Sequence, residues 1–287
     1  MKKYYKTYAA ALIFSVVVTM ALTYLRSIAL VTEFDSAAVF YVHGAKLPRV
    51  FSIVAVASII VVALLVYFMR SGVKKLSPTP NLSSPIIIFT SSLLAFMTIA
   101  YFILTLNFGM KDGFTVMEKA ALVLSLPAAM YHLIGTAIPM KNKNIRLIFS
   151  IAMILWLFTV LMSVYFRKGV IVNNPNRTLE LAALSVVLLF FANEGRFDAN
   201  VAQPTTYIFL GLTSIIIGGL YVLPNIILTV MRIYPDSLNV AFMVVYGCMW
   251  LYILLRMYHY ARDIRHIDSN SYDSAIISPY LLENSKN

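Results

Sequence analysis

The stretch Phe191–Asn200, with the sequence FANEGRFDAN, separates two long apolar runs at 179–193 and 206–233. It places two acids and one base within five positions, in a chain that has only 12 acids. Apolar runs joined by a short polar connection are typical of helices that cross a membrane in succession. This stretch is also the best candidate in the chain for a polar cluster that does more than join two helices.

The composition of the whole chain agrees with this local pattern. The 287 residues are 60% hydrophobic and only 12% charged, and the mean hydropathy is +0.81. A soluble domain has about 25% charged residues. Because the charges are also bunched between apolar runs, we predict an all-α integral membrane protein that crosses the bilayer several times.

A transmembrane helix needs about 20 predominantly apolar residues, and eight segments of the chain are candidates. They are residues 8–25 with an extension to 31, 50–69, 85–108, 119–139, 147–166, 179–193, 206–233 and 238–258. The sixth is the shortest, and the eighth is expected to continue as an amphipathic helix through Ala261 and Ile264. We therefore predict one domain over residues 1–268, a bundle of about eight transmembrane helices, and a polar, disordered tail over residues 269–287.

Two features of the first span need interpretation. Lys2, Lys3 and Lys6 precede the apolar run, as in a signal peptide, but residues 9–25 are long enough to span and no clear cleavage site follows. We expect a retained first helix. The connection 26–49 contains an apolar segment at 37–42, which is either re-entrant or interfacial, or simply part of a loop after an extended first helix.

Basic residues predict the orientation. Lys and Arg near span ends favour the cytoplasmic side, and 14 of the 23 basic residues fall on the side that carries both termini. We therefore expect a multi-pass protein of the plasma membrane with both termini inside the cell. The net charge of +11 is explained by contact with anionic lipid. No basic stripe interleaved with aromatic residues is present, so the lipid bilayer is the expected partner and nucleic acid is not.

Ionisable groups in the bilayer centre are expensive, so a buried one is a functional candidate. All 12 acids fall at span ends, in connections or in the tail, which weakens the case for ion-coupled transport. His132 lies inside the fourth span and can titrate, bind a ligand or hydrogen-bond to a neighbouring helix. Asn225 follows Pro224 in the seventh span, where it can contact a substrate or pack against a helix.

Glu194, Arg196 and Asp198 form the third candidate, as an ion-paired gate or a headgroup site at the inner membrane interface. On a continuous helix Glu194 and Asp198 would share a face, and Arg196 would point elsewhere. Either the helix breaks at Gly195 and Arg196 turns back to pair with an acid, or a base from another helix joins the acids. Arg146 and Arg256 are the candidates for that base, and the alternative is a charged interfacial loop.

Enzyme motifs are not found in the sequence. The four histidines lie outside any metal-binding motif, Cys248 is the only cysteine, and there is no nucleophile elbow or phosphate loop. We expect no metal and no cofactor. A non-catalytic sensor, assembly or accessory protein that contacts other membrane subunits is the leading function. A small transporter for an uncharged or lipophilic solute and a membrane-embedded lipid enzyme are the alternatives.

Overall fold

The computed structural model describes residues 2–35, 40–76, 84–108, 115–134, 143–166, 174–199, 201–231 and 240–284. These residues form eight α-helices and one short hairpin. The helices are α1 (Lys2–Thr32), α2 (Leu47–Leu76), α3 (Pro85–Phe108), α4 (Val116–Leu133), α5 (Lys143–Tyr165), α6 (Pro175–Asp198), α7 (Pro204–Val230) and α8 (Val240–Asn284). The antiparallel hairpin pairs β1 (Phe34–Asp35) with β2 (Phe40–Tyr41).

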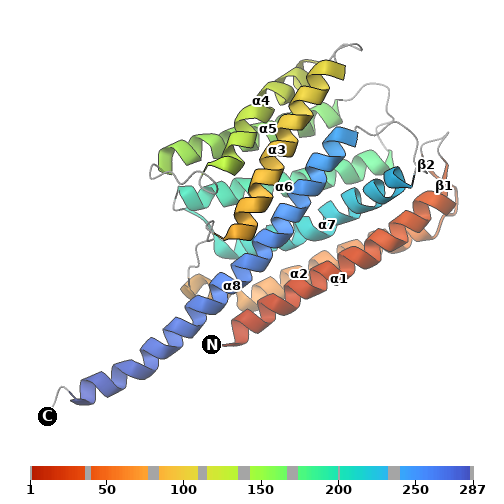
Figure 1. Ribbon diagram of the computed structural model, residues 1–287. Helices are drawn as coiled ribbons and strands as arrows, with labels where there is room; N and C mark the ends of the chain where they lie inside the picture. Colours follow the sequence, from red (N-terminus) through yellow and green to blue (C-terminus); the bar gives the residue numbers. More distant parts are fainter. Residues whose placement is uncertain are drawn as a thin grey trace.

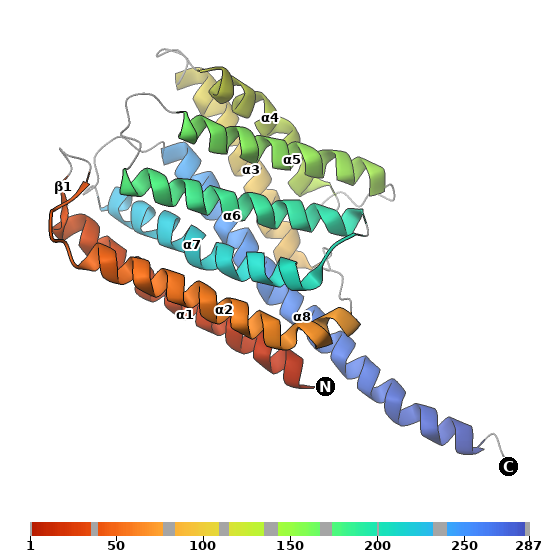
Figure 2. The same cartoon turned by 180° about the vertical axis from the view of Figure 1, so that it is seen from behind.

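Six of the helices form a ring. Each helix from α3 to α8 packs against the next in the chain, and α8 closes the ring by packing against both α3 and α7. The α1–α2 pair lies outside this ring against α7, with further contacts to α8 (Figures 1 and 2). The core therefore runs through the whole molecule, with α7 and α8 shared between the ring and the outer pair.

Seven of the eight described helices are long and apolar enough to cross a membrane, which confirms a multi-pass, all-α membrane bundle. The exception is α4, whose 18 residues begin with the capping box of Thr115 and Glu118. At about 1.5 Å per residue it extends about 27 Å, close to the thickness of a hydrocarbon core. The last part of the span expected at 119–139 lies outside the described residues.

The two ends of the chain lie at the same end of the bundle. The hydroxyl of Tyr8 on α1 donates a hydrogen bond to the carbonyl oxygen of Met257 on α8 at 2.8 Å. Because eight helices that alternate in direction return the chain to its starting side, this contact agrees with eight crossings. α8 then continues beyond the bundle (Figure 1).

Several boundaries differ from those expected. α1 continues to Thr32, which confirms an extended first helix, and a hairpin rather than a plain loop follows it. Residues 37–39 of the apolar segment lie outside the described residues, so its re-entrant or interfacial placement stays a prediction. α6 has 24 residues and is a full-length span rather than a short one. The chain after Asp268 continues as the backbone of α8 to Asn284, and the domain boundary at 268 stays a prediction.

Glycines on α7 allow the central helices to approach closely. A Cβ atom on Gly211 would lie 2.2 Å from Sδ of Met257, and one on Gly219 would lie 2.3 Å from Cγ2 of Thr19. The hydroxyl of Thr19 and the indole of Trp250 both donate hydrogen bonds to the carbonyl oxygen of Ile215, at 3.2 and 3.0 Å. α1 and α8 are thus both fixed to the same carbonyl oxygen of α7.

Candidate functional site

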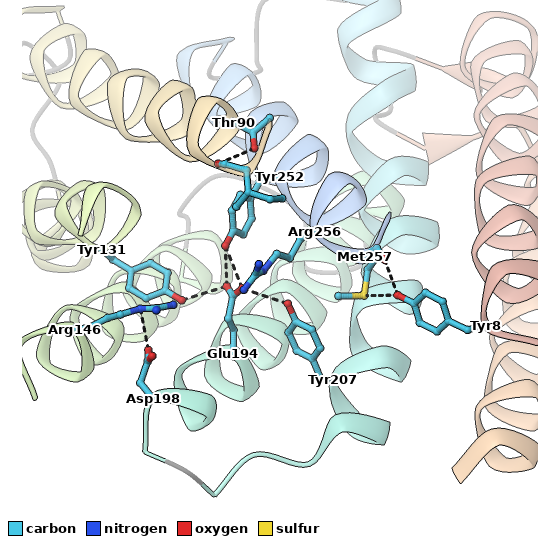
Figure 3. A network of polar contacts seen from close by, with 11 residues as sticks. Tyr8, Thr90, Tyr131, Arg146, Glu194, Asp198, Tyr207, Tyr252, Arg256 and Met257 are labelled. Atoms are coloured by element: carbon cyan, nitrogen blue, oxygen red, sulfur yellow. Dashed lines mark hydrogen bonds and ion pairs between the residues drawn. The ribbon is translucent and has the colours of Figure 1, made fainter. Parts of the chain in front are cut away.

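The carboxylate of Glu194 lies where α4, α6, α7 and α8 meet (Figure 3). Its Oε1 atom accepts hydrogen bonds from Nε of Arg256 at 2.8 Å, from the hydroxyl of Tyr252 at 3.1 Å and from that of Tyr207 at 3.3 Å. Its Oε2 atom lies 3.2 Å from the hydroxyls of Tyr131 and Tyr252. Glu194 and Arg256 are each 1% exposed. We call these five residues the Glu194 cluster.

This arrangement satisfies a charge that would otherwise be very unfavourable. Removing an ion from water costs several kcal/mol, and an ion pair offsets this only when the remaining lone pairs also have partners. Here both oxygen atoms of Glu194 accept hydrogen bonds, and the donors come from three helices other than α6. The cluster therefore joins four helices through one carboxylate.

The helix that carries Glu194 does not break at Gly195, so the first alternative for this stretch is wrong. α6 continues through Gly195 to Asp198. The glycine serves packing between helices instead, because a Cβ atom at this position would lie 1.9 Å from Oγ of Ser150 on α5. The continuous helix directs Glu194 into the bundle, where Arg256 of α8 provides the base, as the second alternative proposes.

Arg196 and Asp198 are not part of the cluster. Arg196 is exposed and makes no ion pair within the described ranges, so the expectation that it pairs with an acid is wrong. Two positions along α6 from Glu194, its side chain points to another face. Asp198 forms an ion pair with Arg146 of α5, with Nε and Oδ2 at 3.3 Å, and both side chains are partly exposed. The two acids are therefore matched by two bases from different helices.

His132 lies beside the Glu194 cluster in an aromatic environment. The ring is buried and meets three others edge to face, those of Tyr131, Phe191 and Tyr252, with centroids 5.1 to 5.6 Å apart. Two of these rings belong to tyrosines that donate to Glu194. The histidine thus packs against the cluster and helps to position its donors.

Asn225 is at the opposite end of the bundle and belongs to a second polar site. Its Nδ2 atom donates to the carbonyl oxygen of Tyr221, one turn earlier in α7, at 2.8 Å. Pro224 has no N–H group, so the carbonyl of Leu220 lacks its usual helix partner. Nη1 of Arg26 donates to this carbonyl at 2.6 Å and to that of Tyr221 at 2.9 Å. The proline thus creates an acceptor that a buried arginine from α1 occupies.

Sequence reasoning did not find the tyrosines of the Glu194 cluster or the burial of Arg26. The chain has 18 tyrosines, and tyrosine is common in membrane proteins, so the sequence gives no signal that distinguishes the three tyrosines of the cluster. A signal for Arg26 did exist. Pro224 leaves a carbonyl without a donor inside an apolar run, and the arginine at the end of an extended first helix is a suitable donor.

The described contacts of the Glu194 cluster are hydrogen bonds and one ion pair. Among the described residues, no group of three or more His, Cys, Asp or Glu side chains is arranged to hold a metal ion. The oxygens of Glu194 face hydroxyl and guanidinium groups, and neither of the two cavities considered below is lined by a cluster residue. The cluster is built to hold helices together.

Together, fold and cluster define a multi-pass, all-α membrane protein with a buried ion pair at one end of its bundle. Comparison with protein-family models, with curated proteins and with solved structures finds no match to this chain.

Proposed function

We propose that the protein is a non-catalytic membrane protein of the sensor or accessory class, in which the Glu194 cluster holds one of two helix arrangements. The observation that supports this is the complete occupation of the carboxylate. Both oxygens accept hydrogen bonds from side chains of the protein itself. A catalytic carboxylate has to reach a substrate, whereas one that links four helices can control how they pack.

A buried ion pair is suited to this role because it has discrete states. Removing one partner of such a pair costs about 3–5 kcal/mol, whereas exchange of both for neutral groups is often tolerated. A signal or partner protein that separates α6 from α8 therefore has to compensate for the broken pair. Packed helices with such contacts change between alternative arrangements rather than deform continuously.

The experiment combines stability with a distance measurement. Glu194→Gln and Arg256→Gln are made singly and together in the purified protein, and unfolding is followed in lipid nanodiscs. We expect each single variant to lose about 3–5 kcal/mol and the double variant to lose less than the sum. Additive, small losses would contradict the proposal.

The second part of the experiment asks whether the pair controls the position of α8. Spin labels are attached to cysteines at positions 196 and 258, which are exposed on α6 and α8, in a protein with Cys248→Ala. With the cluster intact, we expect one narrow distribution of the distance between the two spin labels. In Glu194→Gln we expect a second population of molecules with a different distance. An unchanged distribution in a folded Glu194→Gln protein would leave the cluster as a stability element only and would overturn the two-state role.

The expected partners are the bilayer, which the apolar helices require, and further membrane subunits that respond to the helix arrangement. We propose the plasma membrane as the location, with the Glu194 end of the bundle at the cytoplasmic side. This assignment is supported by the excess of Lys and Arg at that end.

Transport of a lipophilic solute is the second candidate. It is favoured by two cavities at opposite ends of α2, one of about 290 Å³ near Tyr67 and Phe209, and one of about 350 Å³ near Phe51. A transporter exposes its site to each side in turn. Uptake of lipophilic dyes into vesicles that contain the purified protein, lost on Phe209→Trp, would favour transport over sensing.

A further inference from the structure

Arg26 is a buried cation whose described acceptors are all neutral. It is 1% exposed, and besides the carbonyls of Leu220 and Tyr221 it contacts Oδ1 of Asn176, at 2.9 Å from Nη2. Its guanidinium carbon lies 5.9 Å from the ring centroid of Tyr221. No carboxylate among the described residues is within ion-pair distance of Arg26, in contrast to Arg256. Its charge is therefore solvated by dipoles but not neutralised by a described acid.

The side chain of Arg26 also lines a cavity of about 350 Å³ between α1, α2, α6 and the hairpin. This volume is at the lower end of the range for small-molecule sites, about 300–1,000 Å³. The walls combine polar atoms from Tyr41, Ser52 and Thr178 with the apolar side chains of Phe51 and Leu179. A ligand there would meet a cation at one point and apolar surface elsewhere.

Further features of the lining favour an anion. Tyr41 lies on the hairpin, and burial raises the pKa of its hydroxyl, so the group stays protonated at neutral pH and can donate. Pro175 and Thr178, in the first turn of α6, line the cavity as well. A helix N-terminus has partial positive charge.

Neither of the two acids nearest in sequence to the lining forms an ion pair with Arg26. Glu180 lies on α6 between the lining residues Leu179 and Ala182 and is buried. No ion pair joins it to Arg26 within the described residues. Glu33 follows α1 directly, and its Oε2 atom accepts a hydrogen bond from the backbone N–H of Leu47 at 2.9 Å. This contact ties the residue after α1 to the start of α2. Its carboxylate is not within ion-pair distance of Arg26.

We propose that this cavity binds an amphipathic anion, with its carboxylate or phosphate group against Arg26 and Tyr41 and its apolar part along Phe51 and Leu179. The anion neutralises the guanidinium that the fold buries. Two sources share this chemistry, namely an anionic lipid that enters from the bilayer and a free carboxylate or phosphate from solution. The site is at the opposite end of the bundle from the Glu194 cluster, so its existence does not depend on the function proposed for that cluster.

The experiment uses the full chain in nanodiscs of phosphatidylcholine, with and without phosphatidylglycerol. Binding of anionic lipid is measured by native mass spectrometry and by the shift of the unfolding temperature, and inorganic phosphate is titrated separately. We expect Arg26→Gln, which keeps side-chain N–H donors for Leu220, to weaken anion binding by about tenfold or more, the effect of losing one charge-assisted hydrogen bond. Arg49→Gln removes an exposed charge at the start of α2 and is the matched control, with less than about twofold effect expected on the same scale.

Two further variants keep the test decisive if Arg26→Gln does not fold. Phe51→Trp fills the cavity without touching Arg26, and Tyr41→Phe removes only a hydroxyl. We expect both to weaken anion binding. If substitution of Arg26 or Phe51 weakens the binding of phosphatidylglycerol alone, the cavity is a lipid site. If the substitutions weaken the binding of phosphate, the ligand is a soluble anion.

Three results would overturn the proposal. The first is that neither phosphatidylglycerol nor phosphate binds to the unmodified protein. The second is that all variants bind the anion equally well. The third is that Asp236→Asn and Arg26→Gln destabilise the protein equally and neither changes anion binding. The last result would assign the counter-ion to an acid in the connection 232–239, which lies outside the described residues.

Discussion

Nε of Arg256 on α8 lies 2.8 Å from Oε1 of Glu194 on α6, although the whole of α7 separates these two helices in the sequence. The pair is the centre of a cluster in which each hydroxyl has a defined acceptor. Each tyrosine hydroxyl of the cluster can therefore be compared with a buried tyrosine hydroxyl that has no described acceptor.

Tyr252→Phe should destabilise the protein by about 1.5–3 kcal/mol, because its hydroxyl is within hydrogen-bond distance of both oxygens of a charged group. Tyr246→Phe is the control. Tyr246 is also on α8 and fully buried, but its hydroxyl has no hydrogen-bond partner within the described ranges, so its loss should be neutral or stabilising. Chemical unfolding in mixed micelles compares the two, and equal costs would contradict the assigned contacts.

Gly195→Ala should destabilise by about 1–3 kcal/mol, because the added Cβ atom overlaps the Oγ atom of Ser150. Ser150→Gly removes the side chain that the new Cβ atom would overlap, so the double variant should recover most of the lost stability. Gly247→Ala is the control, since its Cβ atom would meet the flexible tip of Ile226 at 3.1 Å and Cγ2 of Val222 at an ordinary contact distance of 4.0 Å. A double variant no more stable than Gly195→Ala would mean that Ser150 is not the obstacle.

Arg196→Gln should change stability by less than about 0.5 kcal/mol, because the side chain is exposed and has no ion pair within the described ranges. Arg146→Gln should have a larger effect, up to about 1 kcal/mol, since it leaves Asp198 without the ion pair at 3.3 Å. The thermal midpoints of the two variants, which have the same change in charge, give the comparison. A larger loss of stability in Arg196→Gln than in Arg146→Gln would contradict the assignment of Arg146, rather than Arg196, as the ion-pair partner of Asp198.

His132→Phe should be better tolerated than His132→Ala. Phenylalanine keeps a ring for the edge-to-face contacts with Tyr131, Phe191 and Tyr252, each worth about 0.5–1.5 kcal/mol, whereas alanine also leaves a cavity. His132→Gln separates the effect of the ring from that of hydrogen bonding. Greater stability of the Gln variant than of the Phe variant would show that polar contacts dominate at this position.

Topology is tested by reporter fusions. Fusions after Lys75, after Lys143 and at the C-terminus should report the cytoplasm, and a fusion near Asn174 should report the outside, because basic residues favour the first set of positions. The contact between Tyr8 and Met257 places both ends of the chain at one end of the bundle. An outside C-terminus with an inside N-terminus would contradict this arrangement.

The architecture was accessible from sequence because it depends on composition and run length. Apolar runs between charged connections predict membrane helices directly, and the extension of the first helix to Thr32 follows from the same pattern. The sixth span is the shortest expected from the sequence, because its apolar run stops before Glu194 and Arg196. In the structure one of these charges is inside the bundle with a partner, and the other is exposed.

The site was less accessible because its contacts are between distant parts of the chain. Sequence spacing showed that Glu194 and Asp198 share a helix face and need bases from elsewhere, and it named Arg146 and Arg256 as candidates. It did not show which base joins which acid, nor that Gly195 is needed for contact with Ser150 rather than for a turn. Those facts depend on how α5 and α8 pack against α6.

The separation of Glu194 from Arg256 along the chain has a consequence for biosynthesis. The two residues are 62 positions apart. At about 5–20 residues per second, the ribosome makes Arg256 about 3–12 s after Glu194. Arg26 precedes its acceptor Leu220 by 194 positions, so it waits about three times as long. Glu194 and Arg26 thus enter the membrane before their native partners are synthesised. The insertion machinery or bound lipid has to solvate Arg26 until α7 is inserted and Glu194 until α8 is inserted.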